Sequence, residues 1–271
     1  MMNNKPKIIA EIGWNHLGNI KLAEKFIESA AKSGADFCKF QTWSPKYLKP
    51  GKWDFDGRRK IYEKATLSYD DHIKLKKICI KNKVKFITSI FNLNDLNFLS
   101  KLEKRFIKIP SHEVYNLELI EKCLKKFDKV FISVGAAKWS EIINITKLKN
   151  FKTKAVLMHC VSSYPCHFEN LNFPKLEKLR KLTRNIGYSG HHSTIDDAIL
   201  AISKGASIVE KHFTINPKLK GRDNKFAITP IMLTRLVDYR DNFYNMMKPK
   251  GLNVQVCEMD IFKNYRGRWS K

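Results

Sequence analysis

Short runs of β-branched and aromatic residues alternate along this chain with longer segments whose apolar residues recur every three or four positions. The first run, residues 7–12, is followed by a segment in which Leu22, Phe26, Ile27 and Ala30 keep the spacing of one helix face. The pattern predicts strands at residues 7–12, 37–41, 85–89, 105–109, 130–133, 155–159, 185–189 and 208–213. It predicts helices at residues 20–33, 68–82, 93–102, 117–125, 140–148, 173–182, 195–204 and 230–247.

Regular alternation of strands and helices predicts a parallel sheet with helices outside it. Eight such units over about 240 residues match a closed (β/α)8 TIM barrel in size. A doubly wound open sheet is the alternative, but no G-x-G-x-x-G follows the first strand. We expect one barrel domain over residues 1–249, with a long polar loop at residues 42–67, and a polar tail over residues 250–271. Gly34 is expected just past the first helix, and Ser68 is expected to cap the second.

The charge balance is strongly basic, with 51 Lys and Arg against 26 Asp and Glu. Such an excess suggests an anionic partner, such as nucleic acid or a membrane. However, 41 of the 51 are lysines spread over the whole length, a pattern that coding-DNA bias also produces. No apolar stretch approaches the roughly 20 residues of a membrane span, and the N-terminus does not resemble a signal peptide. The six cysteines are scattered, mostly in apolar runs, as expected for buried thiols in a reducing compartment. We therefore expect a cytoplasmic protein that binds neither membrane nor nucleic acid.

Polar residues concentrate where the predicted strands end, which is the catalytic face of such a barrel. Lysines and hydroxyl groups there suit a phosphorylated or carboxylated substrate. His191 and His212 follow neighbouring strands and could bind one divalent metal, with His192 as the alternative to His191. His159 is interpreted as structural. The strand-end set comprises Glu11, Asn15, His16, Lys39, Gln41, Ser89, Lys108, Ser111, His112, Glu113, Ser133, His159, Ser162, Tyr164, Ser189, His191, His192, Glu210, Lys211 and His212.

Six ordered motifs resemble those of the sialic acid synthases, which include N-acetylneuraminate, legionaminate and pseudaminate synthases. They are AEIGWNHLGN at 10–19, GADFCKFQT at 34–42, KIPSHE at 108–113, HCVSSYP at 159–165, GYSGHH at 187–192 and EKHFT at 210–214. Each motif alone is weak, but six in register, within a resemblance that covers residues 7–247, are a strong signal.

The resemblance implies condensation of phosphoenolpyruvate with an N-acetylated amino-sugar aldehyde, N-acetylmannosamine or a relative. The products would be a nine-carbon 2-keto sugar acid and phosphate. It implies a divalent metal, Mn2+ first and Mg2+ or Co2+ as alternatives, on His191 and His212. The residues carried over for phosphoenolpyruvate are Lys39, Ser89, Lys108, Ser111, Ser133, Ser162 and Ser189. Those for the sugar are Glu11, Gln41, Tyr164 and Asp223, and the catalytic set is Glu113, Glu11, Lys39 and Lys108. The base is either Glu113 or a water on the metal.

Some positions depart from the family pattern. Ser189-Gly190-His191 stands where the family usually has Ser-Asp-His, so an orienting carboxylate is missing there. The family's C-terminal antifreeze-like domain, which closes the sugar site of a partner subunit, is not expected in residues 250–271. We expect a homodimer, with the cap supplied by a separately encoded protein or replaced by the 42–67 loop as a lid. The alternatives are a synthase with another acceptor and a non-catalytic basic barrel that binds an anionic partner.

Overall fold

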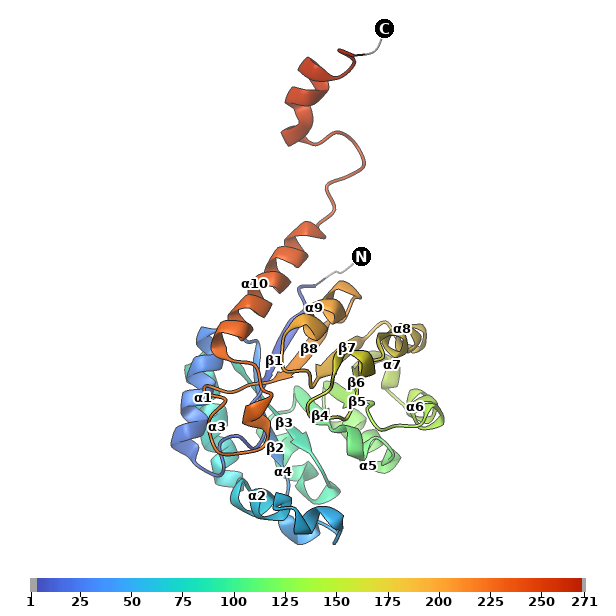
Figure 1. The fold of residues 1–271 in the computed structure, drawn as a ribbon. Helices are drawn as coiled ribbons and strands as arrows, with labels where there is room; N and C mark the ends of the chain where they lie inside the picture. Colours follow the sequence, from blue (N-terminus) through green and yellow to red (C-terminus); the bar gives the residue numbers. More distant parts are fainter. Residues whose placement is uncertain (1–3, 270–271) are drawn as a thin grey trace.

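The computed structural model describes residues 4–269 and shows a closed parallel barrel of eight strands in chain order (Figure 1). The first strand pairs with both the second and the eighth, which closes the sheet. The predicted (β/α)8 TIM barrel is therefore confirmed. The strands are β1 (Lys7–Glu11), β2 (Phe37–Thr42), β3 (Lys85–Ile90), β4 (Phe106–Ile109), β5 (Lys129–Ser133), β6 (Ala155–Cys160), β7 (Ile186–Gly190) and β8 (Ile208–His212).

Helices surround the barrel, and most of them follow the predicted spans within a few residues. Two were not predicted: α2 (Arg58–Lys64) lies within the expected polar loop, and α7 (Phe151–Lys154) precedes β6. The others are α1 (Ile20–Lys32), α3 (Tyr69–Lys81), α4 (Leu96–Leu102), α5 (Leu117–Lys126), α6 (Trp139–Thr146), α8 (Phe173–Leu182), α9 (Asp196–Ser203) and α10 (Pro230–Met246). None of the helices within residues 4–269 is long and apolar enough to cross a membrane.

Both predicted helix signals act as expected. The Ser68 side chain accepts a hydrogen bond from the backbone N–H of Asp71 and so caps α3. Gly34 follows the end of α1 with φ +87°, in the left-handed region that favours glycine. A Cβ there would also lie 2.9 Å from Cγ1 of Val237 on α10, so this glycine allows close packing of the two elements.

The barrel interior has two layers because side chains on a strand alternate between its faces. The lower layer is apolar and consists of Ile9, Phe37, Ile87, Phe131, Val156, Met158 and Ile208, with Phe106 packed against it. Two residues further along each strand, the same inward face carries Glu11, Lys39, Ser89, Lys108, Ser133, Cys160 and Glu210. The apolar layer therefore forms the floor beneath this layer of polar side chains, called here the polar chamber, which lies toward the carboxyl ends of the strands.

The segment between β2 and α3 is more ordered than a polar loop. It contains 3-10 turns at Pro45–Tyr47 and Lys52–Phe55 followed by α2. The Trp43 ring packs edge-on against Tyr62, and its Nε1 donates to the Tyr62 carbonyl (3.1 Å). These aromatic residues anchor the segment to the barrel rim, whereas the Phe55 side chain is 92% exposed.

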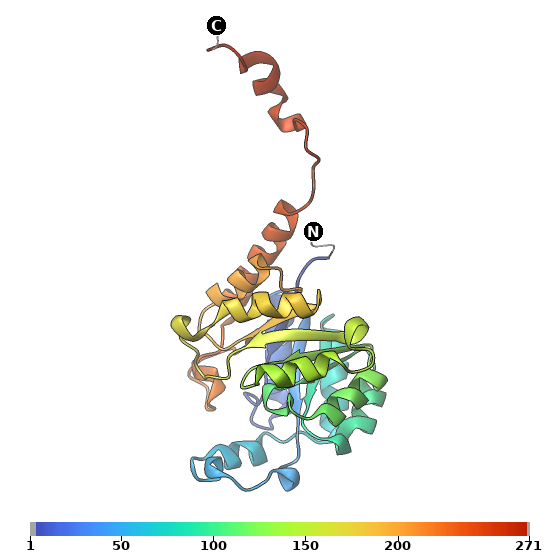
Figure 2. The ribbon, with the colours of Figure 1, turned by 90° about the vertical axis from the view of Figure 1, so that its right-hand side faces the viewer.

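The C-terminal segment leaves the barrel after α10 and extends away from it, at the opposite end of the molecule from α2 (Figures 1 and 2). The expected polar tail contains helical turns at Val256–Glu258 and Ile261–Tyr265. Residues 270–271 of the expected tail lie outside the described residues. Within this chain, the described part of the tail does not approach the mouth of the barrel, where α2 lies.

Candidate active site

Four charged side chains from four strands meet inside the polar chamber. Lys39 Nζ lies 3.0 Å from Glu11 Oε2 and 3.6 Å from Glu210 Oε1. Lys108 Nζ lies 3.1 Å from both carboxylate oxygens of Glu210. All four side chains are buried. The two lysines and two glutamates balance in charge. Ionised side chains can be buried in this way because each one is paired with a group of opposite charge.

The pKa values of these groups move in different directions. Burial would raise the pKa of Glu210, but Lys108 and Lys39 lower it to about 2. Burial raises the pKa of Glu11 despite the attraction of Lys39. Burial likewise lowers the pKa of Lys108, whereas the two glutamates overcome burial and raise the pKa of Lys39. Glu210 is therefore the fixed negative charge, and Glu11 is the carboxylate best suited to take up a proton.

The five serines predicted to bind phosphoenolpyruvate lie at the ends of the strands around this cluster. Ser89 accepts a hydrogen bond from Lys39 Nζ (2.9 Å), and Ser189 donates to Glu210 Oε1 (3.1 Å). Among the described residues, the buried Ser133 hydroxyl has no hydrogen-bond partner. A buried hydroxyl without a partner is costly, so Ser133 is free to bind a ligand group.

Ser111 and Ser162 converge on Gly135, whose N–H donates to Ser111 Oγ (3.2 Å). A Cβ on Gly135 would lie 2.5 Å from Ser162 Oγ and 2.9 Å from Ser111 Oγ, so a larger residue at this position would displace both hydroxyl groups. Cys160 accepts a hydrogen bond from Ser111 Oγ at 3.4 Å. From the sequence we expected this residue only to be a buried thiol. Burial would raise the pKa of Cys160, but His191 lowers it to about 7. The spacing of Cys160 could have identified it as a residue of the polar chamber. It lies two residues after Met158 of the apolar floor and therefore on the same inward face of β6.

His191 and His212 lie side by side at the ends of β7 and β8, with ring centroids 5.5 Å apart. His191 Nδ1 donates to the Val161 carbonyl (2.7 Å), since a carbonyl only accepts. His192 instead contacts the Cys166 carbonyl through Nδ1 and stacks on Phe168. The neighbour of His212 is therefore His191 rather than the alternative, His192.

The histidine pair fits a divalent metal. The hydrogen bond from His191 Nδ1 leaves the Nε2 lone pair free, which is the usual arrangement of a metal-ligating histidine. His212 Nδ1 lies 3.2 Å from Asp223 Oδ2 but makes no hydrogen bond of good geometry. Within residues 4–269 no group of three or more His, Cys, Asp or Glu side chains could hold a metal. Two imidazoles would thus leave the remaining positions of a bound ion to water and substrate.

The residues predicted to contact the sugar occupy different places around the mouth. Gln41 Nε2 donates to Glu11 Oε1 (2.5 Å), and Tyr164 lies against the His191 ring with centroids 4.0 Å apart. Asp223 contacts His212, which makes it a partner of the proposed metal ligand. Sequence reasoning missed Phe226, whose ring centroid lies 5.2 Å from that of His212. No periodic signal marks Phe226, because it follows a 3-10 turn in the loop after β8.

Glu113 stands apart from the four-charge cluster. It lies on the 3-10 turn Ser111–Glu113 after β4, and its Oε2 accepts a hydrogen bond from Asn116 (3.3 Å). Burial raises its pKa, and no group of the cluster contributes to the shift. The neighbouring His112 ring instead packs on Phe91, and burial lowers its pKa to about 4, with Lys108 and Lys39 acting in the same direction.

His159 is buried, and its Nε2 contacts the Leu171 carbonyl (2.8 Å), an environment that a structural histidine would have.

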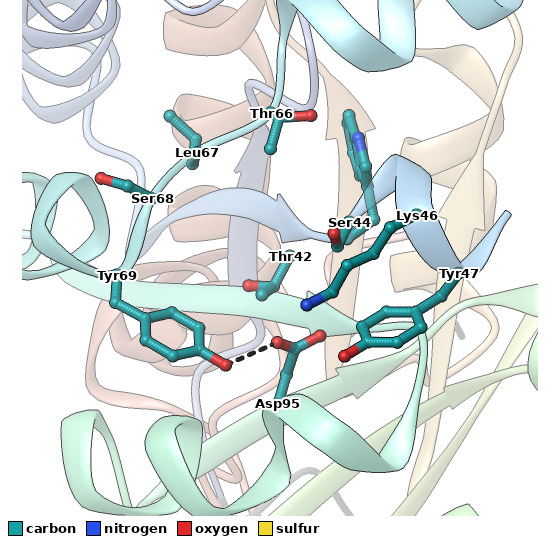
Figure 3. A pocket seen from close by; sticks show the side chains of 10 residues that line it. Thr42, Ser44, Lys46, Tyr47, Thr66, Leu67, Ser68, Tyr69 and Asp95 are labelled. Carbon is teal, nitrogen blue, oxygen red and sulfur yellow. Dashed lines mark hydrogen bonds between the residues drawn. The ribbon is translucent and has the colours of Figure 1, made fainter.

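A separate hollow of about 280 Å3 lies between the segment after β2 and the start of α3 (Figure 3). Lys46, Tyr47 and Asp95 face one another there, and Tyr69 donates to Asp95 (2.9 Å). It is built from other residues than the charged chamber.

Comparisons with known proteins identify the family of this chain. A model of the NeuB family matches residues 26–251. The chain belongs to the NeuB family. It is 33% identical to the N,N'-diacetyllegionaminic acid synthase of Campylobacter jejuni, with 86% of this chain and 74% of that protein covered. It is also 33% identical to the N-acetylneuraminate-9-phosphate synthase of Drosophila melanogaster, with 96% and 72% covered.

Among solved structures, the N-acetylneuraminic acid synthetase of Leptospira borgpetersenii matches with a TM-score of 0.88 and 30% identity, covering 98% of this chain and 94% of that one. Several of the curated relatives are named as sugar acid synthases. This chain is therefore an enzyme of the NeuB type, and the acids named for these relatives differ from one to the next.

Proposed function

We propose that this protein condenses phosphoenolpyruvate with an N-acetylated amino-sugar aldehyde, giving a nine-carbon 2-keto sugar acid and phosphate. The observation that carries the proposal is the buried cluster of Lys39, Lys108, Glu11 and Glu210, which shares one mouth with five serines and a histidine pair. Membership of the NeuB family and the names of its relatives support the same reaction class.

The two lysines suit the two anionic groups of phosphoenolpyruvate. Glu210 holds both ammonium groups in place before substrate binds, so little reorganisation is needed when a phosphate or carboxylate arrives. Ser133, Ser111 and Ser162 add hydroxyl groups beside the lysines. Charge-assisted hydrogen bonds from lysine are strong in such a buried chamber, since water screens them little.

The reaction then forms a carbon–carbon bond and a carbon–oxygen bond to water, and breaks the carbon–oxygen bond to phosphate. Carbon 3 of phosphoenolpyruvate attacks the aldehyde carbon, whose oxygen takes up a proton and becomes a hydroxyl group, and water adds to the positively charged carbon 2. The tetrahedral intermediate expels phosphate by cleavage of its C–O bond. Lys39 and Lys108 stabilise the anionic groups throughout, and a divalent metal held by His191 and His212 would supply Lewis acidity toward the aldehyde oxygen.

Glu11 is the candidate base for the attacking water. Its Oε2 makes no hydrogen bond of its own beyond the ion pair with Lys39, and burial raises its pKa. Glu113 has a raised pKa as well, but its carboxylate is turned to Asn116. We therefore assign the proton from water to Glu11 and keep Glu113 as the alternative. Gln41 would hold the Glu11 carboxylate in place through Oε1.

The acceptor sugar would lie at the outer rim, between Tyr164, Phe226 and the histidine pair. The Tyr164 and Phe226 rings are 5.8 Å apart and offer apolar faces beside His212. Such faces suit the methyl of an N-acetyl group better than a hydroxyl group.

The experiment is a phosphate-release assay on the purified chain with phosphoenolpyruvate, Mn2+ and a panel of acceptors. The panel contains N-acetylmannosamine, its 6-phosphate and 2,4-diacetamido-6-deoxy sugars. Phosphate release that requires both an acceptor and the metal supports the proposal. Release at the same rate without any acceptor indicates a phosphatase and contradicts it.

A further inference from the structure

A second buried ion pair lies on the outer side of β7 and β8, outside the charged chamber. Lys211 Nζ donates to both carboxylate oxygens of Asp197, at 2.8 and 2.7 Å, and each residue is only 1% exposed. Asp197 comes from the first turn of α9, and the Tyr188 hydroxyl donates to its Oδ2 (3.0 Å). The three side chains form a closed polar group within an otherwise apolar layer.

The third N–H of the Lys211 ammonium donates to the backbone carbonyl of His192 (2.7 Å), so all three of its donors are used. Lys211 directly precedes His212, and His192 directly follows His191. The ion pair therefore connects the end of β8, which carries His212, with the turn after β7, which carries His191. The turn after β7, which contains His191 and His192, is held by a second contact as well, because the Cys166 N–H donates to the His191 carbonyl (3.0 Å).

Gly190 shows that there is room for only one carboxylate beside Lys211. Gly190 and Lys211 are register partners on adjacent parallel strands, so a side chain at position 190 would project beside that of Lys211. A Cβ on Gly190 would lie 2.3 Å from Asp197 Oδ2 and 2.5 Å from Tyr188 Cε1. The space that a side chain at position 190 would need is already occupied by the Asp197 carboxylate and the Tyr188 ring.

We propose that Asp197 is a positioning residue for the His191–His212 pair, and that it supplies from α9 the carboxylate that position 190 lacks. It fixes the Lys211 ammonium, which in turn fixes the His192 carbonyl and with it the direction of the His191 ring. This inference rests on the proposed function, since the histidine pair matters there as the metal site. The residues concerned touch neither phosphoenolpyruvate nor the acceptor in that proposal.

The first test removes both charges together, because a single charge left buried would endanger folding. The double variant K211M/D197N should fold, as shown by circular dichroism, but bind Mn2+ ten- to a hundredfold more weakly, as expected when a partner of a metal ligand is lost. The matched control is D196N, which alters the exposed acid next to Asp197 on the same turn. It should keep the wild-type affinity for Mn2+.

The second test moves the carboxylate from α9 to β7. G190D alone should be destabilised, because its side chain meets both Asp197 and the Tyr188 ring. In the swap G190D/D197A the Tyr188 ring must still move aside, so the comparison is with D197A: the swap should bind Mn2+ more tightly than D197A, in keeping with the register pairing of positions 190 and 211. A merely structural role for Asp197 would raise or lower the melting temperature without this recovery of metal affinity.

A metal-free readout separates this inference from the proposed function. The side-chain 15N NMR signals of His191 and His212, assigned with H191Q and H212Q, should shift in K211M/D197N and return in the swap. Unchanged signals and unchanged Mn2+ affinity in folded K211M/D197N would overturn the role of Asp197. Wild-type protein that binds no Mn2+ would contradict the proposed function, while the NMR shifts would still support the positioning role.

Discussion

Lys108 and Glu210 are 102 residues apart in the chain, yet the Lys108 ammonium lies 3.1 Å from both Glu210 carboxylate oxygens inside the barrel. The pair exists because β4 and β8 each carry an inward-facing charge two residues above the apolar floor. Because the pair is buried, removal of either group would leave the other as an unpaired buried charge and would destabilise the fold. Glu210 therefore holds the Lys108 ammonium in place inside the barrel.

Removal of either lysine should weaken phosphoenolpyruvate binding. A charge-assisted hydrogen bond contributes about 1.5–3 kcal/mol, so K39A and K108A should each raise the dissociation constant roughly ten- to a hundredfold. Isothermal titration with phosphoenolpyruvate measures the change. The control is K85A, which removes an exposed lysine at the opposite end of the barrel. Wild-type affinity in both K39A and K108A would show that the lysines do not hold this substrate.

Phosphoenolpyruvate affinity should fall at alkaline pH. Burial lowers the pKa of Lys108 below its ordinary value of 10.5, so its charge is lost earlier than that of a solvated lysine. The dissociation constant should rise as pH increases toward 10. K108R keeps its charge over this range, and its affinity should vary less steeply with pH. Parallel pH profiles for the two proteins would contradict the assignment.

Glu210 should stabilise the fold in a pH-dependent way. Its folded-state pKa of about 2 lies below the ordinary value of 4.5, so the stabilisation is fully present above pH 4.5 and is lost as pH falls toward 2. Urea unfolding of wild type and E210Q should therefore show a difference in unfolding free energy that narrows below pH 4.5. A difference that stays constant from pH 6 to pH 3 would be incompatible with this role.

Metal binding should depend on His191, His212 and Asp223 and not on His192. H191A and H212A should abolish tight Mn2+ binding, and D223N should weaken it ten- to a hundredfold, because Asp223 lies beside His212 Nδ1. H192A is the matched control, since His192 is turned toward Cys166 and Phe168. The Mn2+ affinity of all four variants is measured by titration with Mn2+, in which electron paramagnetic resonance reports the free ion. Loss of binding in H192A alone would reverse the assignment.

Much of the barrel could be predicted because its two periodicities are local. Ile9 and Glu11, like Phe37 and Lys39, are two residues apart on one strand face, so the apolar floor and the polar chamber are visible in the sequence. Helix α2 was missed because its residues, Arg58–Lys64, carry no buried face. Its place is set by contacts of Tyr62 with Trp14 and Trp43.

The parts of the site that sequence could not supply depend on contacts between distant segments. The missing carboxylate at Gly190 is replaced by Asp197, seven residues later on a helix, and no spacing rule links the two. Asp223 is similar: the resemblance suggests a sugar contact, and only the folded chain brings it to His212. The expected homodimer and the separately encoded cap stay predictions.

The most direct test of the central claim follows carbon 3 of phosphoenolpyruvate. Phosphoenolpyruvate labelled with 13C at that position is incubated with the protein, Mn2+ and N-acetylmannosamine or a related acceptor, and the reaction is followed by NMR. The account predicts that the vinylic signal is replaced by that of a saturated methylene bonded to the former aldehyde carbon, with one phosphate released per product. Conversion to labelled pyruvate, or an unchanged vinylic signal with every acceptor of the panel, would contradict it.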